Sequence, residues 1–211
     1  MLVISSATKN AYIALEHNEK HVQTTIDANC KQSENVLVAI NQLLEENDLD
    51  LDSIKEFGVV VGPGSFTGIR IGVSLVKGLC AGKKLDKVIA ISTFDVMARQ
   101  ILKEEKPEND FICVIDALSN LVYMQEFDKN GKPINEAKII SKVELDSMTQ
   151  IKYGLEEENV CENKIQLQAE TLIETAKDLR EINSVDVRCL EPIYLRKSQA
   201  EENLNKNKKT S

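Results

Sequence analysis

The segment Gly62–Gly72, which reads GPGSFTGIRIG, holds residue types that could bind an anion. Glycines let backbone N–H groups converge on a phosphate where a helix begins. The spacing is not that of a Walker loop, because no Lys-Ser/Thr pair follows Gly68, and it is not GxGxxG. A structural interpretation accounts for the same residues, with Pro63 and Gly64 forming a turn and Ser65 capping a helix.

The other residues that could do chemistry have simpler interpretations. His17 and His21 stand four apart on a predicted turn and strand, so they do not share the helix face that an HExxH-type metal site requires. Asp116 at a strand end is interpreted as a turn former, and Ser65 as a cap because GxSxG is absent. We therefore predict no catalytic residue and no metal ligand in this chain.

The helix predicted over 66–82 contains an unusual number of glycines, and each costs roughly 1 kcal/mol against alanine. At about 100° per residue, its apolar arc spans roughly 200°, about twice what one core face needs. We expect one side to pack on a sheet and the glycine side to receive either the predicted helix 33–47 or that helix and a partner protein. The glycine side carries Gly68, Gly72, Leu75, Leu79 and Gly82, and the adjacent side carries Ile69, Val73, Val76 and Cys80.

Composition narrows the class of protein. The 211 residues are 42% hydrophobic, enough for one large domain or two small ones. A formal charge of -8 disfavours tight, direct binding of a nucleic acid. Five single cysteines without a CxxC pair suit reduced thiols in a protein core. Without a signal-peptide pattern or a membrane-spanning run, we expect a cytoplasmic protein with no membrane contact.

The elements that must position these residues follow from apolar periodicity. Three strands are predicted first, and then helix, strand, helix, strand and helix, which is the order of a ribonuclease-H-like half-domain of actin-like proteins. Ser33 is the expected cap of the first helix, and Ser92 to Asp95 form a capping box before the third. The predicted elements are strands 1–5, 12–15, 22–26, 57–61 and 88–91 and helices 33–47, 66–82 and one beginning near 93.

The second half is predicted to be a shorter copy of the first. After a charged linker at 104–109, strands at 111–115 and 122–127 surround a turn, one helix follows near 169–179, and 192–196 is extended. We therefore predict an α/β, two-lobed, actin-like (ribonuclease-H-like) fold in which a mixed sheet is flanked by helices and the second lobe is abbreviated. The expected domains are 1–104, 105–202 and a disordered tail at 203–211.

Several motifs together resemble the bacterial TsaB family, also called YeaZ. The longest is GPGSFTGIRIGVSLVKGL at 62–79, and the similarity runs over residues 1 to about 127 and returns near the C-terminus. Residues 134–183 do not match convincingly. The shorter motifs are IALEH, QSENVL at 32–37, ISTFDVMA at 91–98, VIDA at 114–117, VY at 122–123 and EPIYLR at 191–196.

This resemblance implies a non-catalytic subunit of the machinery that makes threonylcarbamoyladenosine (t6A) in tRNA. It implies a TsaD-like catalytic partner, a TsaE-like ATPase, tRNA contact only through the complex, and a homodimer when the subunit is alone. ATP/ADP and metal would belong to the partner subunits. We expect replacing Gly72 by leucine to abolish the heterodimer and spare the fold. The implied partner-binding residues lie on helices 33–47 and 66–82: Val36, Leu37, Ile40, Leu44, Gly64, Ser65, Phe66, Gly68, Arg70, Gly72, Leu75, Val76 and Leu79.

Departures from the family pattern bear on activity. Ser5-Ser6 stands where relatives have Asp-Thr, so the chain lacks the carboxylate that actin-like proteins place near metal and phosphate. Leu118 replaces the arginine of a DAR motif, and Lys31 replaces a histidine. An enzyme acting on its own, either a kinase of the actin-like superfamily or a peptidase, stays the alternative. The charged stretches Glu156–Glu158 and Lys206–Lys209 are interpreted as solvated, although the lysines could touch tRNA within a complex.

Overall fold

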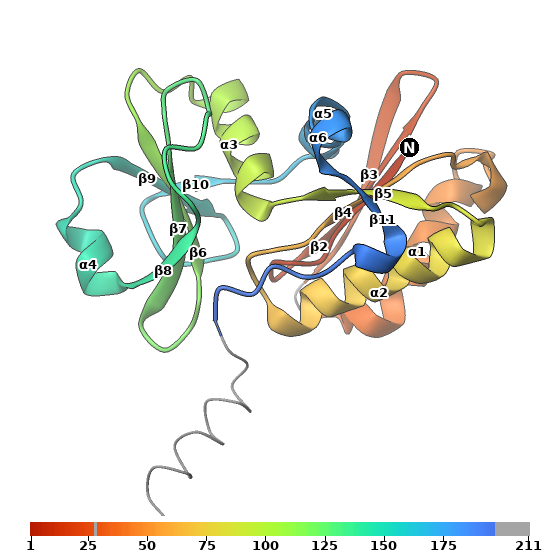
Figure 1. The fold of residues 1–211 in the computed structure, drawn as a ribbon, viewed down its shortest axis with the longest axis horizontal. Coiled ribbons are helices and arrows are strands. Elements are labelled where there is room, and N and C mark those ends of the chain that lie inside the picture. The colour runs from red at the N-terminus through yellow and green to blue at the C-terminus, as the bar shows by residue number, and fades with distance from the viewer. Residues whose placement is uncertain (28, 197–211) are drawn as a thin grey trace, which may run out of the picture.

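The computed structural model describes residues 1–27 and 29–196 and contains two β-sheets that lie side by side (Figure 1). The predicted tail at 203–211, with its lysines, lies outside the described residues. The fold class predicted from the sequence is confirmed: two mixed sheets are flanked by helices, and the second lobe is the smaller one.

The first sheet is built from the opening β-meander and two parallel strands. Its order is β11-β5-β4-β1-β2-β3, in which β1, β4 and β5 are parallel and the other pairings are antiparallel. The central strands β1 and β4 are buried on both faces, which explains their continuous apolar sequence. The strands are β1 (Leu2–Ser5), β2 (Ala11–His17), β3 (Lys20–Ile26), β4 (Phe57–Val60), β5 (Lys87–Ile91) and β11 (Ser184–Asp186).

Helices cover both faces of this sheet. On one face lie α1 (Gln32–Glu45) and α2 (Phe66–Lys83), and on the other lie α5 (Ala169–Asp178) and α6 (Arg180–Asn183) (Figure 1). Single-turn 3-10 helices, η1 (Leu51–Ser53) and η2 (Val187–Cys189), complete this lobe.

The second sheet repeats the strand order of the first. Its order is β10-β9-β6-β7-β8, which matches β5-β4-β1-β2-β3, with the parallel and antiparallel pairs in the same places. The copy lacks a counterpart of α2, because residues 156–162 alone connect the parallel strands β9 and β10. The elements are β6 (Phe111–Asp116), β7 (Leu121–Phe127), β8 (Lys138–Ser141), α4 (Lys142–Ser147), β9 (Ile151–Leu155) and β10 (Asn163–Ile165).

The two lobes exchange their last helices, which changes the predicted division at residue 104. Helix α3 (Thr93–Glu104) leaves the first sheet and packs beside β6 and β10, whereas α5 and β11 from the second half join the first sheet. One hydrophobic core consequently runs through both lobes. Within the predicted segment 105–202, the described residues 105–196 are therefore not a separate unit, because helix α5 buries its apolar face on the first sheet.

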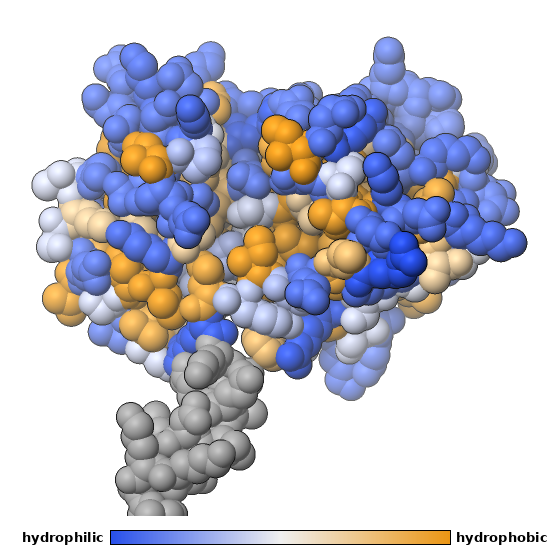
Figure 2. All heavy atoms as spheres, in the orientation of Figure 1, coloured by the Kyte–Doolittle hydropathy of each residue, from blue (hydrophilic) through white to orange (hydrophobic). Residues whose placement is uncertain are grey.

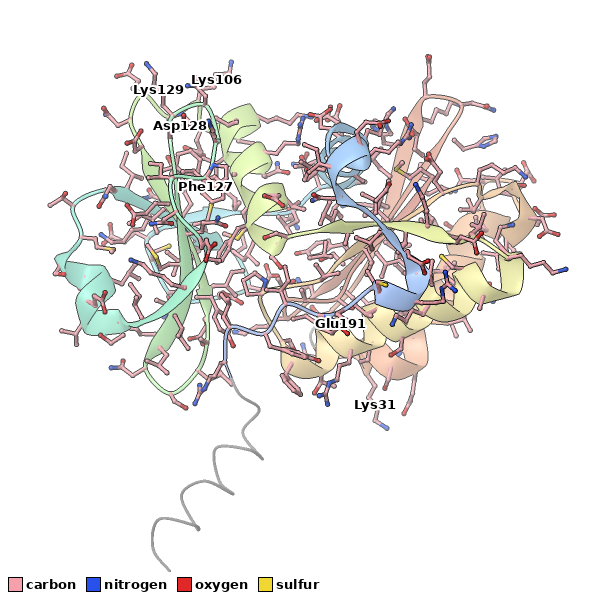
Figure 3. All side chains as sticks on the ribbon, viewed as in Figure 1. Lys31, Lys106, Phe127, Asp128, Lys129 and Glu191 are labelled. Atoms are coloured by element: carbon pink, nitrogen blue, oxygen red, sulfur yellow. The ribbon has the colours of Figure 1, made fainter. Side chains whose placement is uncertain are left out.

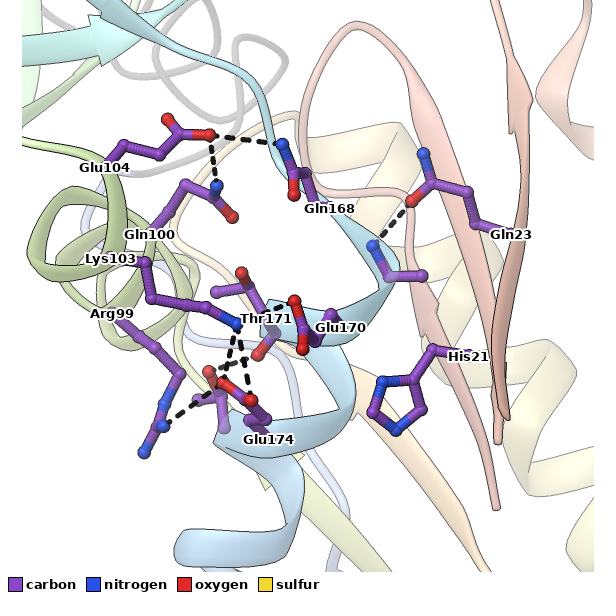
Figure 4. Close-up of polar contacts among 12 residues, drawn as sticks. His21, Gln23, Arg99, Gln100, Lys103, Glu104, Gln168, Glu170, Thr171 and Glu174 are labelled. Atoms are coloured by element: carbon purple, nitrogen blue, oxygen red, sulfur yellow. Dashed lines mark hydrogen bonds and ion pairs between the residues drawn. The ribbon is translucent and has the colours of Figure 1, made fainter. Parts of the chain in front are cut away.

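Polar side chains reinforce the contact between α3 and α5 (Figure 4). Lys103 makes ion pairs of 2.8 Å with Glu170 and 3.2 Å with Glu174, and Arg99 pairs with Glu174. Arg99 also pairs with Asp178. These side chains are partly exposed, so each pair contributes about 0–1 kcal/mol. The apolar packing beneath them stabilises the junction more than they do.

Two of the three helix caps predicted from local sequence are confirmed and one is wrong. Ser92 and Asp95 form the predicted capping box, and Ser65 accepts a hydrogen bond from the Gly68 N–H at 3.2 Å. The predicted cap Ser33 is wrong, because α1 begins one residue earlier and its N-cap, Lys31, makes no side-chain cap. The hydrogen bond of Gln32 to the Lys9 carbonyl, 2.8 Å long, holds that helix start instead.

Candidate functional site

The glycine loop before α2 is a backbone junction. The Ser65 N–H donates to the Ala7 carbonyl at 2.6 Å, and the Thr93 hydroxyl donates to the Pro63 carbonyl at 2.7 Å. Gly64 has φ +155°, and a Cβ there would lie 2.0 Å from the Ala7 oxygen. The loop is thus closed by its own chain, which supports the structural interpretation over the phosphate cradle.

The glycines of α2 have two different environments. A Cβ on Gly68 would lie 1.9 Å from the Ser6 carbonyl oxygen, and one on Gly72 would lie 2.5 Å from the Ser6 hydroxyl. A Cβ on Gly78 or Gly82 would meet no atom within 4 Å outside the helix's own nearby backbone. The close approach predicted for Gly68 and Gly72 is thus made mainly by the end of β1. Helix α1 is also a neighbour, because Gln32 Oε1 lies 3.3 Å from the Cβ position of Gly68. Replacing Gly72 by leucine would disturb the fold, contrary to our expectation.

Burial separates the predicted partner-binding residues into two groups. Side chains that face the core cannot touch a partner, and this excludes six of them: Val36, Ile40, Leu44, Gly68, Gly72 and Val76. The helical wheel of α2 places Val76 on the side that packs on the sheet, and Val76 is indeed buried. On α1, the apolar residues Val36, Ile40 and Leu44 also face the core. The rest are at least partly exposed and remain candidates: Leu37, Gly64, Ser65, Phe66, Arg70, Leu75 and Leu79.

An arginine–aromatic cluster, formed by Phe66, Arg70 and Tyr194, lies at the exposed start of α2. The rings of Phe66 and Tyr194 stack with centroids 4.5 Å apart, and the Arg70 guanidinium lies 4.0 Å from the Phe66 centroid. Arg70 Nε donates to the Tyr194 hydroxyl at 2.8 Å. Tyr194 is 41% exposed. It was missed as a site residue, although it lies in the EPIYLR motif.

The segment 190–196 brings Tyr194 to this place and touches both lobes. The Ile193 N–H donates to the Val61 carbonyl at 2.8 Å, so the segment continues along the end of β4. Arg196 donates to the Ala117 carbonyl, also at 2.8 Å, at the end of β6. Residues 192–196, predicted to be extended, form no strand and end in a bend, and they place one ring of the cluster.

A cavity of about 630 Å³ opens between the two lobes beside the cluster. The turn after β1, the starts of α1 and α2 and the loops after β6 and β9 line it, and Phe66 and Arg196 reach it as well. Figure 2 shows apolar residues gathered between the two lobes on the face that it presents.

Glu158 is a buried carboxylate in this cavity. Its side chain is 5% exposed, and Oε2 accepts the Asp116 N–H at 2.7 Å. Burial raises its pKa to about 7, the Asp116 N–H opposes the rise, and the charges of Glu157 and Asp116 add to it. The interpretation of Glu156–Glu158 as solvated charge is wrong for Glu158. Sequence pattern could not reveal this burial, because it depends on the short connection between β9 and β10.

The remaining candidates have structural partners. His21 Nε2 lies 3.4 Å from Glu16 Oε1, and within residues 1–27 and 29–196 no group of three His, Cys, Asp or Glu side chains could hold a metal ion. Asp116 accepts the Leu118 N–H at 3.3 Å and lies 3.6 Å from the Lys142 ammonium, so it shapes the turn after β6. Only Cys80 and Cys113 are the buried cysteines that the composition suggested.

Comparison with known proteins finds relatives that are named for t6A biosynthesis. Residues 26–175 match the family model for TsaD, tRNA N6-adenosine threonylcarbamoyltransferase. The chain is 28% identical over 144 residues to the tRNA threonylcarbamoyladenosine biosynthesis protein TsaB of Buchnera aphidicola, covering 66% of this chain and 64% of the relative. It is 30% identical to TsaB of Escherichia coli, over 62% of this chain and 57% of the relative. The chain thus spans less than two thirds of the length of these relatives.

The fold has close solved counterparts. YeaZ from Pseudomonas aeruginosa has a TM-score of 0.76 and 20% identity, covering 92% of this chain and 98% of that one. A second structure, described as similar to peptidase YEAZ from the same organism, has a TM-score of 0.77 at the same coverage. The resemblance to TsaB and YeaZ found in the sequence is confirmed. In the described part of the chain, no helix is long and apolar enough to cross a membrane.

Proposed function

This chain belongs to the TsaD family of tRNA N6-adenosine threonylcarbamoyltransferases, and from that premise we propose that it is a non-catalytic subunit in t6A biosynthesis. In this proposal it binds a TsaD-like catalytic subunit through the exposed side of α1 and α2, in the cytoplasm, and stabilises that partner's active arrangement. A TsaE-like protein supplies ATP hydrolysis, nucleotide and metal stay with the partners, and tRNA meets the chain only through the complex.

The observation that carries this proposal is that α1 exposes large apolar side chains and α2 exposes the arginine–aromatic cluster. Leu37 is 47% exposed and Val38 is 52% exposed, on a helix whose opposite side is fully packed. Aromatic residues and arginine are the side chains that most often dominate binding energy at protein interfaces. We call the set of Leu37, Val38, Phe66, Arg70, Leu75, Leu79 and Tyr194 the partner surface.

The serines at the end of β1 favour a structural role for the first lobe. Ser5 and Ser6 are fully buried, and the Ser6 hydroxyl donates to the Gly68 carbonyl at 2.8 Å. By the family pattern Ser5 stands at the carboxylate position and Ser6 at the threonine that follows it. The Ser6 hydroxyl holds α2 in place, whereas the Ser5 hydroxyl has no hydrogen-bond partner among the described residues. This favours a subunit whose N-terminal lobe presents helices over one that positions a phosphate.

A second candidate function is an enzyme that acts alone, and the interlobe cavity favours it. The cavity contains Glu158, whose pKa of about 7 would suit a general acid or base. Calorimetry of the isolated chain with ATP and magnesium separates the two proposals. Tight, stoichiometric binding would favour the kinase, and no binding is expected of the subunit.

The mutational test replaces both Leu37 and Val38 by glutamate. Because these side chains are half exposed, the variant should fold normally, whereas two buried charges at an interface cost several kcal/mol. We expect size-exclusion chromatography to show loss of the complex with the TsaD-like protein and of any homodimer formed by the chain alone.

Ile182→Glu is the matched control. Ile182 is 79% exposed on α6, on the opposite side of the sheet, and the change is of the same chemical kind. It should leave both assemblies intact. A complex that survives the double change at Leu37 and Val38 would show that the partner binds elsewhere.

A further inference from the structure

Arg70 is held rigidly although it is on the surface. Its guanidinium lies 4.0 Å from the centre of the Phe66 ring and 5.6 Å from that of Tyr194, and its Nε donates to the Tyr194 hydroxyl. This Nε bond orients the planar group and leaves the two Nη nitrogens for other acceptors. A guanidinium fixed in this way loses little conformational entropy when it binds an acceptor.

Within residues 1–27 and 29–196, no carboxylate forms an ion pair with this guanidinium. Arg99, Arg180 and Arg188 each form an ion pair with a carboxylate. Arg70 forms none with any described residue, in a chain where 34 acidic residues outnumber 26 basic ones. The arginine is thus oriented without a counter-ion among the residues that the structure describes.

The neighbours of Arg70 indicate which anion fits. The side chains that contact Arg70 are the rings of Phe66 and Tyr194, and Ile71, the next residue on α2, is half-buried. A phosphate backbone would need several cations, and the net charge of -8 opposes it. A carboxylate surrounded by apolar side chains on a protein satisfies both the guanidinium and its neighbours.

We infer that Arg70 is a receptor for one carboxylate of the TsaD-like partner, bound bidentately through its two Nη nitrogens while Phe66 and Tyr194 hold it in place. This inference rests on the proposed function. It adds the chemistry of the contact and gives the segment 190–196 a role, since Tyr194 orients the arginine. The partner residue is an Asp or Glu within its own apolar interface.

The test measures affinity for the TsaD-like protein by calorimetry with the full chain. Arg70→Glu should weaken binding by about a hundredfold or more, because it places two carboxylates opposite each other. Arg70→Lys keeps the charge but loses the fork and the stacking, and it should weaken binding by about tenfold. Lys129→Glu, at the far end of the second lobe (Figure 3), changes the net charge equally and should have no effect.

A charge swap identifies the carboxylate. Acidic residues at the partner's interface are replaced by lysine one at a time, and one of these changes should restore binding to Arg70→Glu. Failure of every swap would overturn the inference. It would also be overturned if Arg70→Glu bound the partner normally while the Leu37 and Val38 double change still abolished binding, a result that leaves the proposed function intact. Loss of tRNA affinity without loss of partner affinity would instead assign Arg70 to phosphate.

Discussion

Replacing Gly68 by alanine is expected to lower the free energy of unfolding by about 2 kcal/mol or more. The new Cβ would lie 1.9 Å from the Ser6 carbonyl oxygen and 3.3 Å from Gln32 Oε1, so α2 must move away from β1. That movement also strains the hydrogen bond from the Ser6 hydroxyl to the Gly68 carbonyl. For a chain of this size, the midpoint of thermal unfolding should fall by about 4–8 °C.

Gly78→Ala provides the matched control in the same helix. Nothing lies within 4 Å of its Cβ position, so only the higher helix propensity of alanine acts. The free energy of unfolding should rise by up to about 1 kcal/mol. Opposite shifts for the same substitution would establish that α2 rests on the turn after β1. A Gly68→Ala variant as stable as the wild type would contradict that packing.

Glu158→Gln is expected to stabilise the protein at pH 8 by about 3 kcal/mol. The wild-type carboxyl has its pKa raised to about 7 in the folded chain, from 4.5 when it is unfolded, because burial disfavours the charge. Between these values the folded state holds a proton that the unfolded state has lost. The contribution of Glu158 to stability is therefore complete below pH 4.5 and is lost as the pH rises through 7.

Urea unfolding from pH 4.5 to pH 8 measures this difference. Glutamine keeps an oxygen that can accept the Asp116 N–H but has no charge, so its advantage over the wild type should grow with pH and disappear at the acidic end. Glu156→Gln, at an exposed position two residues earlier, should show no such trend. A constant difference between Glu158→Gln and wild type at all pH values would mean that Glu158 is charged throughout.

Much of the fold could be predicted because its signals are local. The caps at Ser65 and Ser92 depend on residues within one turn of the helix, and both were found from sequence. The apolar run of β4 predicted a strand covered on both faces, and the helices on each side of the sheet cover it. The topological repeat also followed from element order, although the sequence carries no matching repeat.

The features that escaped prediction depend on distant parts of the chain. The sequence shows glycine at both 68 and 78, but it does not show what each glycine faces. In the structure Gly68 lies against Ser6, whereas no atom lies near the Cβ position of Gly78. Glu158 is buried because a short loop replaces the helix that the first lobe has at this point. Tyr194 reaches Arg70 across 124 positions of sequence, through a segment that returns to β4.

Hydroxyl-radical footprinting of the chain, with and without the TsaD-like protein, tests the central claim most directly. The partner surface should be covered in the complex, so oxidation of Leu37, Phe66 and Tyr194 should fall sharply. Ile182 on α6 and Val143 on α4, which are 79% and 72% exposed, should be oxidised as before. Protection of Ile182 or Val143, with Leu37, Phe66 and Tyr194 still reactive, would contradict the assignment of the α1 and α2 surface to the partner.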